Sequence, residues 1–309
     1  MTLQDLEKQC SLAITGLDIT YGNGIHAVRG VDLDVGQGRC LGLVGESGSG
    51  KSTIVLSILG LLPKSAIIRG SIIVGGDEVV GSKEARMRRL RGRTLGLVAQ
   101  DPMASFDPLM SVAGSVAEAW RVHHLRPRHG DVDESLEHLG IDDAHARARL
   151  RPHMWSGGML QRAAIAAASA HTPSVIIADE PTSALDADRA DSILVTLRST
   201  SAAILLVSHD LDLVARHSDE VAVMYAGEVI ERGDADQVLH RPRHPYARAL
   251  LEATPRPGKG LPKPLYGAPP PLDAEICGCP FEPRCENAQP VCRTKAPDLV
   301  AGVACWEAV

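Results

Sequence analysis

Short apolar runs and alternating positions dominate the first part of the chain. Ser11–Thr20 and Val31–Val35 alternate between apolar and polar side chains, and Cys40–Val44 is continuously apolar. Alternation with a period of two is typical of half-buried strands, whereas a short continuous apolar run is typical of a buried strand. Apolar residues then recur at helical spacing over Ser52–Leu62, until Pro63. We therefore expect three strands followed by a helix.

The middle of the chain changes from strand patterns to helix patterns. Gly70–Val74 and Thr94–Val98 predict two more strands. Over residues 102–155 the strand patterns vanish, and Val112–His124 and Val132–Leu139 have the spacing of amphipathic helices. This change predicts a helical subdomain inserted into a larger α/β domain.

Strand and helix patterns alternate again after the insert. Val175–Ala178 and Ala203–Val207 are short apolar runs of the kind found in buried parallel strands, and Asp186–Ser199 between them has a helical pattern. The dipeptide Ala226-Gly227 separates two further apolar segments and predicts a hairpin. The fold class that we expect is α/β with a largely parallel sheet.

Composition supports a folded protein with an appendage. The chain has 309 residues, 44% of them hydrophobic and 23% charged, and its net charge of −6 argues against a protein that coats nucleic acid. No apolar run approaches the roughly 20 residues of a membrane helix, and the opening MTLQDLEKQC lacks the features of a signal peptide. We expect a cytosolic location, with docking on a membrane protein as an option.

The end of the chain differs from the rest. Residues 254–276 are rich in proline, which holds a chain extended and is typical of a linker. Residues 277–309 contain five of the seven cysteines: Cys277, Cys279, Cys285, Cys292 and Cys305. In a reducing compartment such clustering favours metal binding over disulfides.

The segment GESGSGKS has the spacing of a phosphate-binding loop, and it follows an apolar strand and precedes a helix, as that motif must. Glycines allow the backbone N–H groups to point inward at an anion, and the helix N-terminus adds a partial positive charge. Lys51 is expected to reach the β- and γ-phosphates and Ser52 to bind magnesium. The residues that we expect to bind nucleotide here are Gly45, Glu46, Ser47, Gly48, Ser49, Gly50, Lys51, Ser52 and Thr53.

Two carboxylates close the apolar run VIIADE. The carboxyl edge of a parallel sheet is where ligands gather, and consecutive strand positions point in opposite directions, so the two acids have different tasks. We expect Asp179 to hold magnesium and Glu180 to act as the general base for the attacking water. An ordinary strand end is the alternative for this pair taken alone.

WSGGMLQR, which contains Ser156, Gly157 and Gly158, resembles the signature sequence of ATP-binding cassette (ABC) proteins. The rest of that family's motif set is also present in order over residues 12–250, namely Tyr21, Gln100 in VAQDP, PTSALD ending at Asp186, and His209 in LLVSHD. The resemblance implies a P-loop NTPase fold with a RecA-like core, an antiparallel β subdomain and a helical insert, and two cassettes that sandwich ATP head to tail. It further implies that Tyr21 stacks on adenine, Gln100 senses magnesium, Asp186 lies at the dimer seam and His209 contacts the γ-phosphate.

Some positions leave alternatives or depart from the family pattern. Tyr21 alone could be a turn aromatic, and His209 an ordinary loop histidine. Trp155 and Met159 stand where the superfamily usually has Leu and Gln, and Leu160 where the closest branch has Arg. Met159 has no amide, so contact with the partner's nucleotide must rest on Ser156 and the backbone. These departures bear on whether the two ATP sites of the dimer are equally active, and not on the fold.

Further motifs resemble one branch of the family, the ATP-binding subunits of bacterial dipeptide, oligopeptide and nickel importers. They are QDPMASFDPLM, HPYARAL and the tail GCPFEPRC with its later cysteines. The resemblance implies an ATPase subunit at the cytoplasmic face of the membrane. Its partners are a second, homologous ATPase subunit in a heterodimer, two permeases and an extracytoplasmic substrate-binding protein. A permease helix is expected to dock around Phe106–Trp120.

The resemblance also divides the chain into an ATPase domain of residues 1–253, the linker and the Cys-rich tail. Cys279, Cys285, Cys292 and Cys305 match the family's cysteine pattern, which leaves Cys277 as a spare. Four thiolates suit a [4Fe–4S] cluster or zinc, and the absence of close CxxC pairs favours iron–sulfur. A reduced, metal-free cluster is the alternative.

The leading hypothesis is a subunit that hydrolyses ATP to power peptide import. A nickel or metal-chelate importer is the alternative within the branch. A soluble ABC ATPase of ribosomes or DNA ordinarily has two cassettes or a long coiled coil, and a nucleotide switch without turnover would lack Glu180. An ABC exporter is disfavoured by the importer-like tail.

Overall fold

The computed structural model describes residues 10–183, 185–255, 261–271 and 273–307. The chain forms two compact units, each assembled from separate segments. The first unit comprises residues 1–12, 35–40 and 73–206, and the second comprises residues 13–34, 41–72 and 207–309.

The second unit contains two groups of paired strands. One group contains β2 (His26–Gly36), β1 (Cys10–Thr20) and β4 (Ile67–Val74), most of whose residues belong to this unit. The strands pair in the order β2-β1-β4. In the other group β9 (Glu220–Tyr225) lies between β3 (Cys40–Val44), to which it is parallel, and β10 (Glu228–Asp234), to which it is antiparallel. The observed bounds of β3 match the predicted ones.

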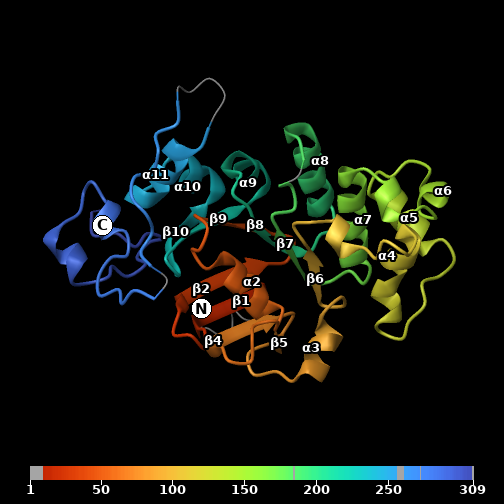
Figure 1. The fold of residues 1–309 in the computed structure, drawn as a ribbon, viewed down its shortest axis with the longest axis horizontal. Coiled ribbons are helices and arrows are strands. Elements are labelled where there is room, and N and C mark those ends of the chain that lie inside the picture. The colour runs from red at the N-terminus through yellow and green to blue at the C-terminus, as the bar shows by residue number, and fades with distance from the viewer. Residues whose placement is uncertain (1–9, 184, 256–260, 272, 308–309) are drawn as a thin grey trace. The chain divides into compact units, whose positions relative to one another are not determined.

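A tight turn joins β9 to β10, as the sequence predicts. Ala226 and Gly227 both have positive φ, 48° and 89°. Two successive residues with positive φ are typical of a type I′ hairpin turn, which twists in the sense that paired strands require. The remaining elements of this unit are α2 (Lys51–Ile58), α9 (Leu211–His217), α10 (Ala235–His240), α11 (Pro245–Ala253), η3 (Glu282–Arg284) and η4 (Pro290–Arg293). Figure 1 shows α10 and α11 beside β10.

The first unit combines a parallel strand group with helices. Strands β8 (Ala203–Val207), β7 (Val175–Asp179) and β6 (Leu95–Val98) are neighbours in that order, and β6 and β7 are parallel. All residues of these three strands except Leu97 and Asp179 are buried. The short β5 (Asp77–Glu78) pairs with the end of β4, and α3 (Glu84–Leu90) follows it.

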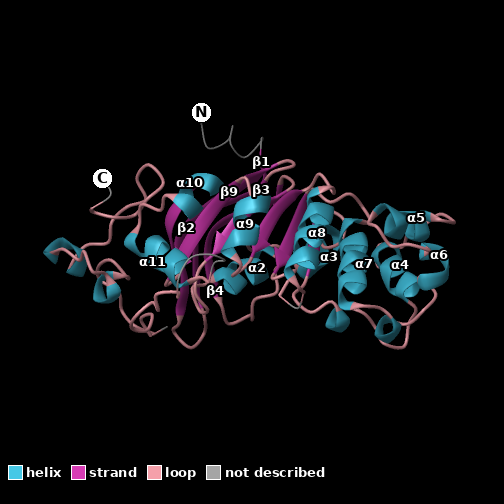
Figure 2. Ribbon diagram, turned by 90° about the horizontal axis from the view of Figure 1, so that it is seen from above, coloured by secondary structure: helices cyan, strands magenta, loops and turns pink. Residues whose placement is uncertain are grey.

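Residues 99–174, all of them described, contain helices and no strand. This confirms the predicted change to helical structure. Helices α4, α5 and α6 gather beside α7 (Figures 1 and 2). The helical elements described between β6 and β8 are η1 (Met103–Ser105), α4 (Val112–Arg121), α5 (Asp131–His138), α6 (Ala144–Arg147), η2 (Pro152–Met154), α7 (Gly157–Ser169) and α8 (Ala187–Arg198).

Candidate nucleotide-binding site

The predicted phosphate loop joins β3 to α2. Gly45 has a φ of 150°, and a Cβ at this position would overlap the carbonyl oxygen of Met224. Gly50 has a φ of 108° and is the N-cap of α2, where a Cβ would lie 2.6 Å from the carbonyl oxygen of Ala27. Because both positions need a positive φ and a close backbone approach, only glycine fits them. The sequence therefore forms the tight turn that the motif predicts.

Lys51 opens helix α2 and bends back over the loop. Its ammonium donates to the carbonyl oxygens of Gly45 and Glu46, at 2.7 and 2.9 Å, and to the hydroxyl of Ser49 at 3.3 Å. These three contacts place a positive charge at the concave side of the loop, where the motif requires one. Ser52 is exposed in the first turn of the same helix.

The predicted adenine-stacking residue lies beside this helix. The hydroxyl of Tyr21 is 3.2 Å from the hydroxyl of Thr53. The second unit therefore brings together Tyr21, the loop and the first turn of α2. His209 belongs to the same unit and is exposed, one residue before Asp210, whose carboxylate caps α9.

Residues from the end of the chain support the loop, and sequence reasoning did not identify them. The backbone N–H of Glu46 donates to the hydroxyl of Tyr246 at 2.9 Å, and Arg284 forms an ion pair with the Glu46 carboxylate at 2.7 Å. Burial raises the pKa of the Tyr246 phenol, and burial likewise raises the pKa of Tyr225. Tyr246 and Arg284 lie in the motifs HPYARAL and GCPFEPRC, but neither motif by itself indicates a contact with the loop.

A cavity of about 250 Å³ lies against the loop. Glu46, Ser47, Gly48 and Ser49 form one side of it, and prolines of the linker form another. The linker residues in this lining are Pro269, Pro270 and Pro271. The predicted linker thus contributes to the surroundings of the loop.

Asp179 and Glu180 lie in the first unit at the end of β7. The strand ends at Asp179, and Glu180 has a φ of 49°, in the left-handed region. The prediction that the two acids alternate along a strand is therefore wrong for Glu180, since its backbone has already left the strand. A non-glycine residue at positive φ costs about 1 kcal/mol or more, and such strain clusters at functional sites. Gln100 is exposed, two residues after β6.

Ser156 is the N-cap of α7, and its hydroxyl accepts a hydrogen bond of 3.3 Å from the N–H of Met159. The helix begins at Gly157, so the signature segment is itself a helix N-terminus. The signature residues lie next to the start of α8. A Cβ on Gly158 would lie 3.9 Å from Arg189, whose guanidinium pairs with the α8 N-cap Asp186 at 3.3 Å.

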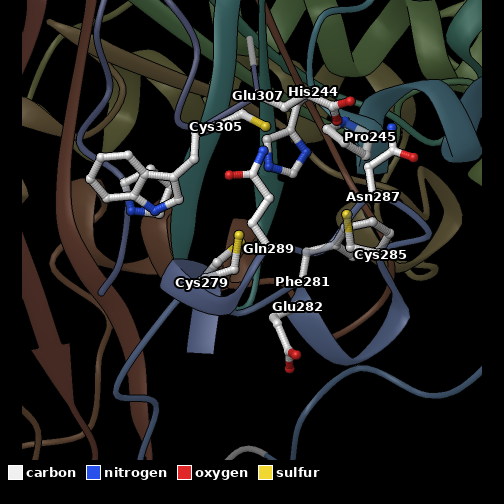
Figure 3. Close-up of a pocket in the computed structure, with 13 residues that line it drawn as sticks. His244, Pro245, Cys279, Phe281, Glu282, Cys285, Asn287, Gln289, Cys305 and Glu307 are labelled. Carbon is white, nitrogen blue, oxygen red and sulfur yellow. The ribbon is translucent and has the colours of Figure 1, made fainter. Parts of the chain in front are cut away.

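Four cysteines of the tail line one small cavity, and Cys277 does not. Figure 3 shows Cys279, Cys285 and Cys305 around the same space as His244. Burial raises the pKa of Cys279 to about 11, and the neighbouring cysteine sulfurs add to the shift. Burial also raises the pKa of Cys285. Within the described residues, no group of three or more His, Cys, Asp or Glu side chains has an arrangement that could hold a metal ion.

The sequence model of the family described as "ABC transporter" matches residues 28–183. The chain belongs to the ABC transporter family. A second model, described as "Oligopeptide/dipeptide transporter, C-terminal region", matches residues 230–292. Both matches agree with the resemblance seen in the motifs.

Curated relatives belong to the same branch of ABC proteins. The oligopeptide transport ATP-binding protein OppD of Mycobacterium tuberculosis is 40% identical over 94% of this chain and 50% of its own length. The dipeptide transport ATP-binding protein DppD of Bacillus subtilis is 39% identical over 88% of this chain and 85% of its own length. The chain spans about half the length of the mycobacterial relative and most of the Bacillus one.

Solved structures show the ABC cassette fold. The cassette MJ0796, in a dimeric post-hydrolysis state with ADP and phosphate, has a TM-score of 0.63 and 25% identity, covering 72% of this chain and 98% of its own. CbiO1 of Clostridium perfringens has a TM-score of 0.66 and 28% identity, covering 75% and 92%. The predicted α/β cassette fold is confirmed. The Cys-rich extension as a separate part of the fold stays a prediction.

In the described part of the chain, no helix has both the length and the apolar character needed to span a bilayer.

Proposed function

We propose that this ABC protein is an ATP-hydrolysing subunit that powers the import of di- or oligopeptides. One observation carries the proposal: a phosphate loop with Lys51 over its concave side, in a chain whose relatives are named for oligopeptide and dipeptide transport. Those names favour peptides over the nickel or metal-chelate alternative. ATP and Mg²⁺ are the ligands that an ABC ATPase requires.

The site residues have the following proposed roles. Glu180 is the general base for the attacking water, and His209 contacts the γ-phosphate. Magnesium neutralises charge on the phosphates, and Ser52, Gln100 and Asp179 would hold it. The carboxylate and hydroxyl oxygens of this set are ligands that magnesium prefers. Tyr21 would stack on adenine, and its hydroxyl contact with Thr53 supports a position beside the loop.

The proposed assembly contains two ATPase subunits, two permeases and an extracytoplasmic substrate-binding protein, at the cytoplasmic face of the inner membrane. Ser156, Gly157 and Gly158 would face the phosphate loop of the other ATPase subunit, which we propose to be homologous rather than identical. Two observations support this role: the segment is an exposed helix N-terminus, and Asp186 of the expected dimer seam lies near it. No nucleic acid is expected among the partners, given the net charge of −6.

The test is uptake of labelled dipeptides, oligopeptides and nickel, in cells with the wild-type protein and in cells with Glu180→Gln. The substitution removes the proton acceptor and keeps the shape of the side chain, so ATP binding should persist while turnover and peptide uptake stop. Lys51→Ala should instead weaken ATP binding itself. Loss of nickel uptake alone would favour the metal branch. Unchanged hydrolysis in Glu180→Gln would refute its role.

The tail carries a second proposal, a [4Fe–4S] cluster or zinc held by Cys279, Cys285, Cys292 and Cys305. Its support is that these four cysteines line one cavity; their side chains as placed do not form a metal-binding arrangement, so a bound metal would have to draw them together. Burial raises the thiol pKa of Cys279 and Cys285, and a bound metal would act in the opposite direction by stabilising the thiolates. Iron, sulfide and zinc analysis after anaerobic purification tests it. Metal-free protein with full ATPase activity in the assembled complex would refute it.

A further inference from the structure

Arg284 of the tail makes a two-pronged ion pair with the phosphate loop. One guanidinium nitrogen donates to Glu46 at 2.7 Å and the other to the second carboxylate oxygen at 3.2 Å. The side chain of Arg284 is only 3% exposed, and that of Glu46 is 27% exposed. Bidentate pairs of this kind combine the strongest protein hydrogen bonds with a fixed geometry.

Other contacts hold Arg284 from several directions. Its guanidinium donates to the hydroxyl of Tyr225 at 3.2 Å and to the backbone carbonyl of Tyr266 at 2.9 Å. It also lies over the rings of Tyr225 and Phe281, 5.7 and 5.9 Å from their centroids, within cation–π range. The hydrogen bond to Glu46 raises the pKa of Arg284 above its ordinary value, so the charge is permanent.

The tail is itself attached to the ATPase core. The N–H of Arg232 donates to Gly302 at 2.8 Å, and the N–H of Ala304 donates to Ile230 at 2.9 Å, which adds a short antiparallel segment to β10. Phe281 packs against Tyr246, with ring centroids 5.4 Å apart. These contacts fix the backbone that carries Arg284 independently of the ion pair.

Glu46 has two opposed effects on a bound nucleotide. Its backbone carbonyl accepts from Lys51 at 2.9 Å and so helps to position the ammonium. Its carboxylate, by contrast, puts a negative charge on a loop that binds the negatively charged phosphates. Unless a cation neutralises it, this charge opposes nucleotide binding through Coulomb repulsion. Arg284 is that cation.

We propose that Arg284 is a positioning residue for the phosphate loop, through which the C-terminal region sets the affinity for nucleotide. It neutralises Glu46 and holds its carboxylate turned toward the tail. This inference rests on the proposed ATPase function. It differs from a merely structural role, because it predicts effects of opposite sign for the two partners of one ion pair.

The experiment measures the dissociation constant of a fluorescent ATP analogue, together with the KM and kcat of ATP hydrolysis, for the full chain in the assembled complex. Arg284→Gln leaves a carboxylate without its cation beside the phosphates, so affinity should fall about tenfold, with KM affected more than kcat. Glu46→Gln leaves the cation and removes the anion, so affinity should rise about threefold. Arg284→Lys keeps the positive charge but cannot make the bidentate contact, so its affinity should lie between those of the wild type and Arg284→Gln.

The double variant and a matched control complete the design. Glu46→Gln combined with Arg284→Gln should recover most of the affinity that Arg284→Gln alone loses. Arg293→Gln is the control, because its side chain is 77% exposed and pairs with Glu282 rather than with a residue of the loop. It should bind the analogue like the wild type.

Each outcome is decisive. If both single variants weaken binding, or if Arg284→Gln binds like the wild type, the proposal is wrong and the pair is structural. If Arg284→Gln does not fold, two affinities still test the proposal. Glu46→Gln should bind the analogue more tightly than the wild type, and Arg284→Lys should bind it more weakly. A wild-type chain that binds no nucleotide would overturn the proposed function instead.

Discussion

The backbone N–H of Glu46 donates a hydrogen bond of 2.9 Å to the hydroxyl of Tyr246, which lies 200 residues further along the chain. Tyr246 is fully buried in α11, and its ring packs on Tyr225 with centroids 4.5 Å apart. The phosphate loop is thus tied to the C-terminal part of the chain by a backbone-to-side-chain hydrogen bond as well as by the ion pair with Arg284. This bond gives the first prediction.

Tyr246→Phe removes the acceptor for that N–H and changes little else. A buried donor without a partner costs about 1 kcal/mol, so the free energy of unfolding should fall by about that amount. Urea denaturation measures it. Tyr266→Phe is the control, since Tyr266 is 78% exposed and its bond to Arg284 uses the backbone. Equal midpoints for Tyr246→Phe and wild type would contradict the prediction.

The sequence predicts those features that depend on local patterns. The bounds of β3 and the position of the loop before α2 follow from a short apolar run and a fixed spacing of glycines. The N-terminal positions of Ser156 and Asp186 follow from their helix-capping side chains. In each case the residues that determine the structure are neighbours in the chain.

Contacts between distant segments were not predictable in this way. Nothing near Glu46 in the sequence points to Arg284, 238 residues away, because the pairing depends on how the tail folds back onto β10. The left-handed backbone of Glu180 was also not predictable from the strand pattern, because alternation applies only within a regular strand and β7 ends at Asp179. Packing of the whole unit, rather than local preference, decides both features.

Gly45→Ala tests the close approach of the loop to β9. A Cβ would overlap the carbonyl oxygen of Met224, at a φ of 150° that side chains rarely adopt. The loop must shift, so we expect ATP affinity to fall by at least tenfold together with a loss of thermal stability. Gly24→Ala is the matched control, because it also has a positive φ, 86°, but nothing lies near its Cβ position. That variant should lose only about 1 kcal/mol of stability. Equal ATP affinity in both variants would argue against the steric explanation.

Ser156→Ala separates a helix cap from a functional contact. Ser156 caps α7 by accepting from the N–H of Met159, and Asp234 caps α10 by accepting from the N–H of Gln237, both at 3.3 Å. Replacing either residue with Ala should cost about 1 kcal/mol of stability, measured by denaturation. Only Ser156→Ala should also lower ATP turnover in the assembled complex, by the loss of a donor to the partner's nucleotide. If Asp234→Ala lowers turnover equally, stability alone explains the effect.

His244 predicts how stability changes with pH. The side chain is 1% exposed, caps α11 by accepting from the N–H of Tyr246 at 3.0 Å, and lies 6.0 Å from the ring of Phe281. Burial lowers its pKa from 6.5 to about 4, so the folded protein keeps it neutral while the unfolded chain protonates it below pH 6.5. Stability from this residue is therefore complete above pH 6.5 and is lost as the pH falls from 6.5 toward 4, by up to about 3 kcal/mol.

The comparison that isolates His244 is the melting temperature of wild type and His244→Asn between pH 7.5 and pH 5. Asn can still cap the helix with its side-chain oxygen but has no group that titrates in this range. We expect the variant to be less stable at pH 7.5, because it loses packing against Phe281, and to have a shallower fall on acidification. Parallel curves would mean that other groups, such as carboxylates protonated in acid, cause the pH dependence. A steeper curve for wild type places the buried neutral imidazole among the contacts that hold the tail against α11.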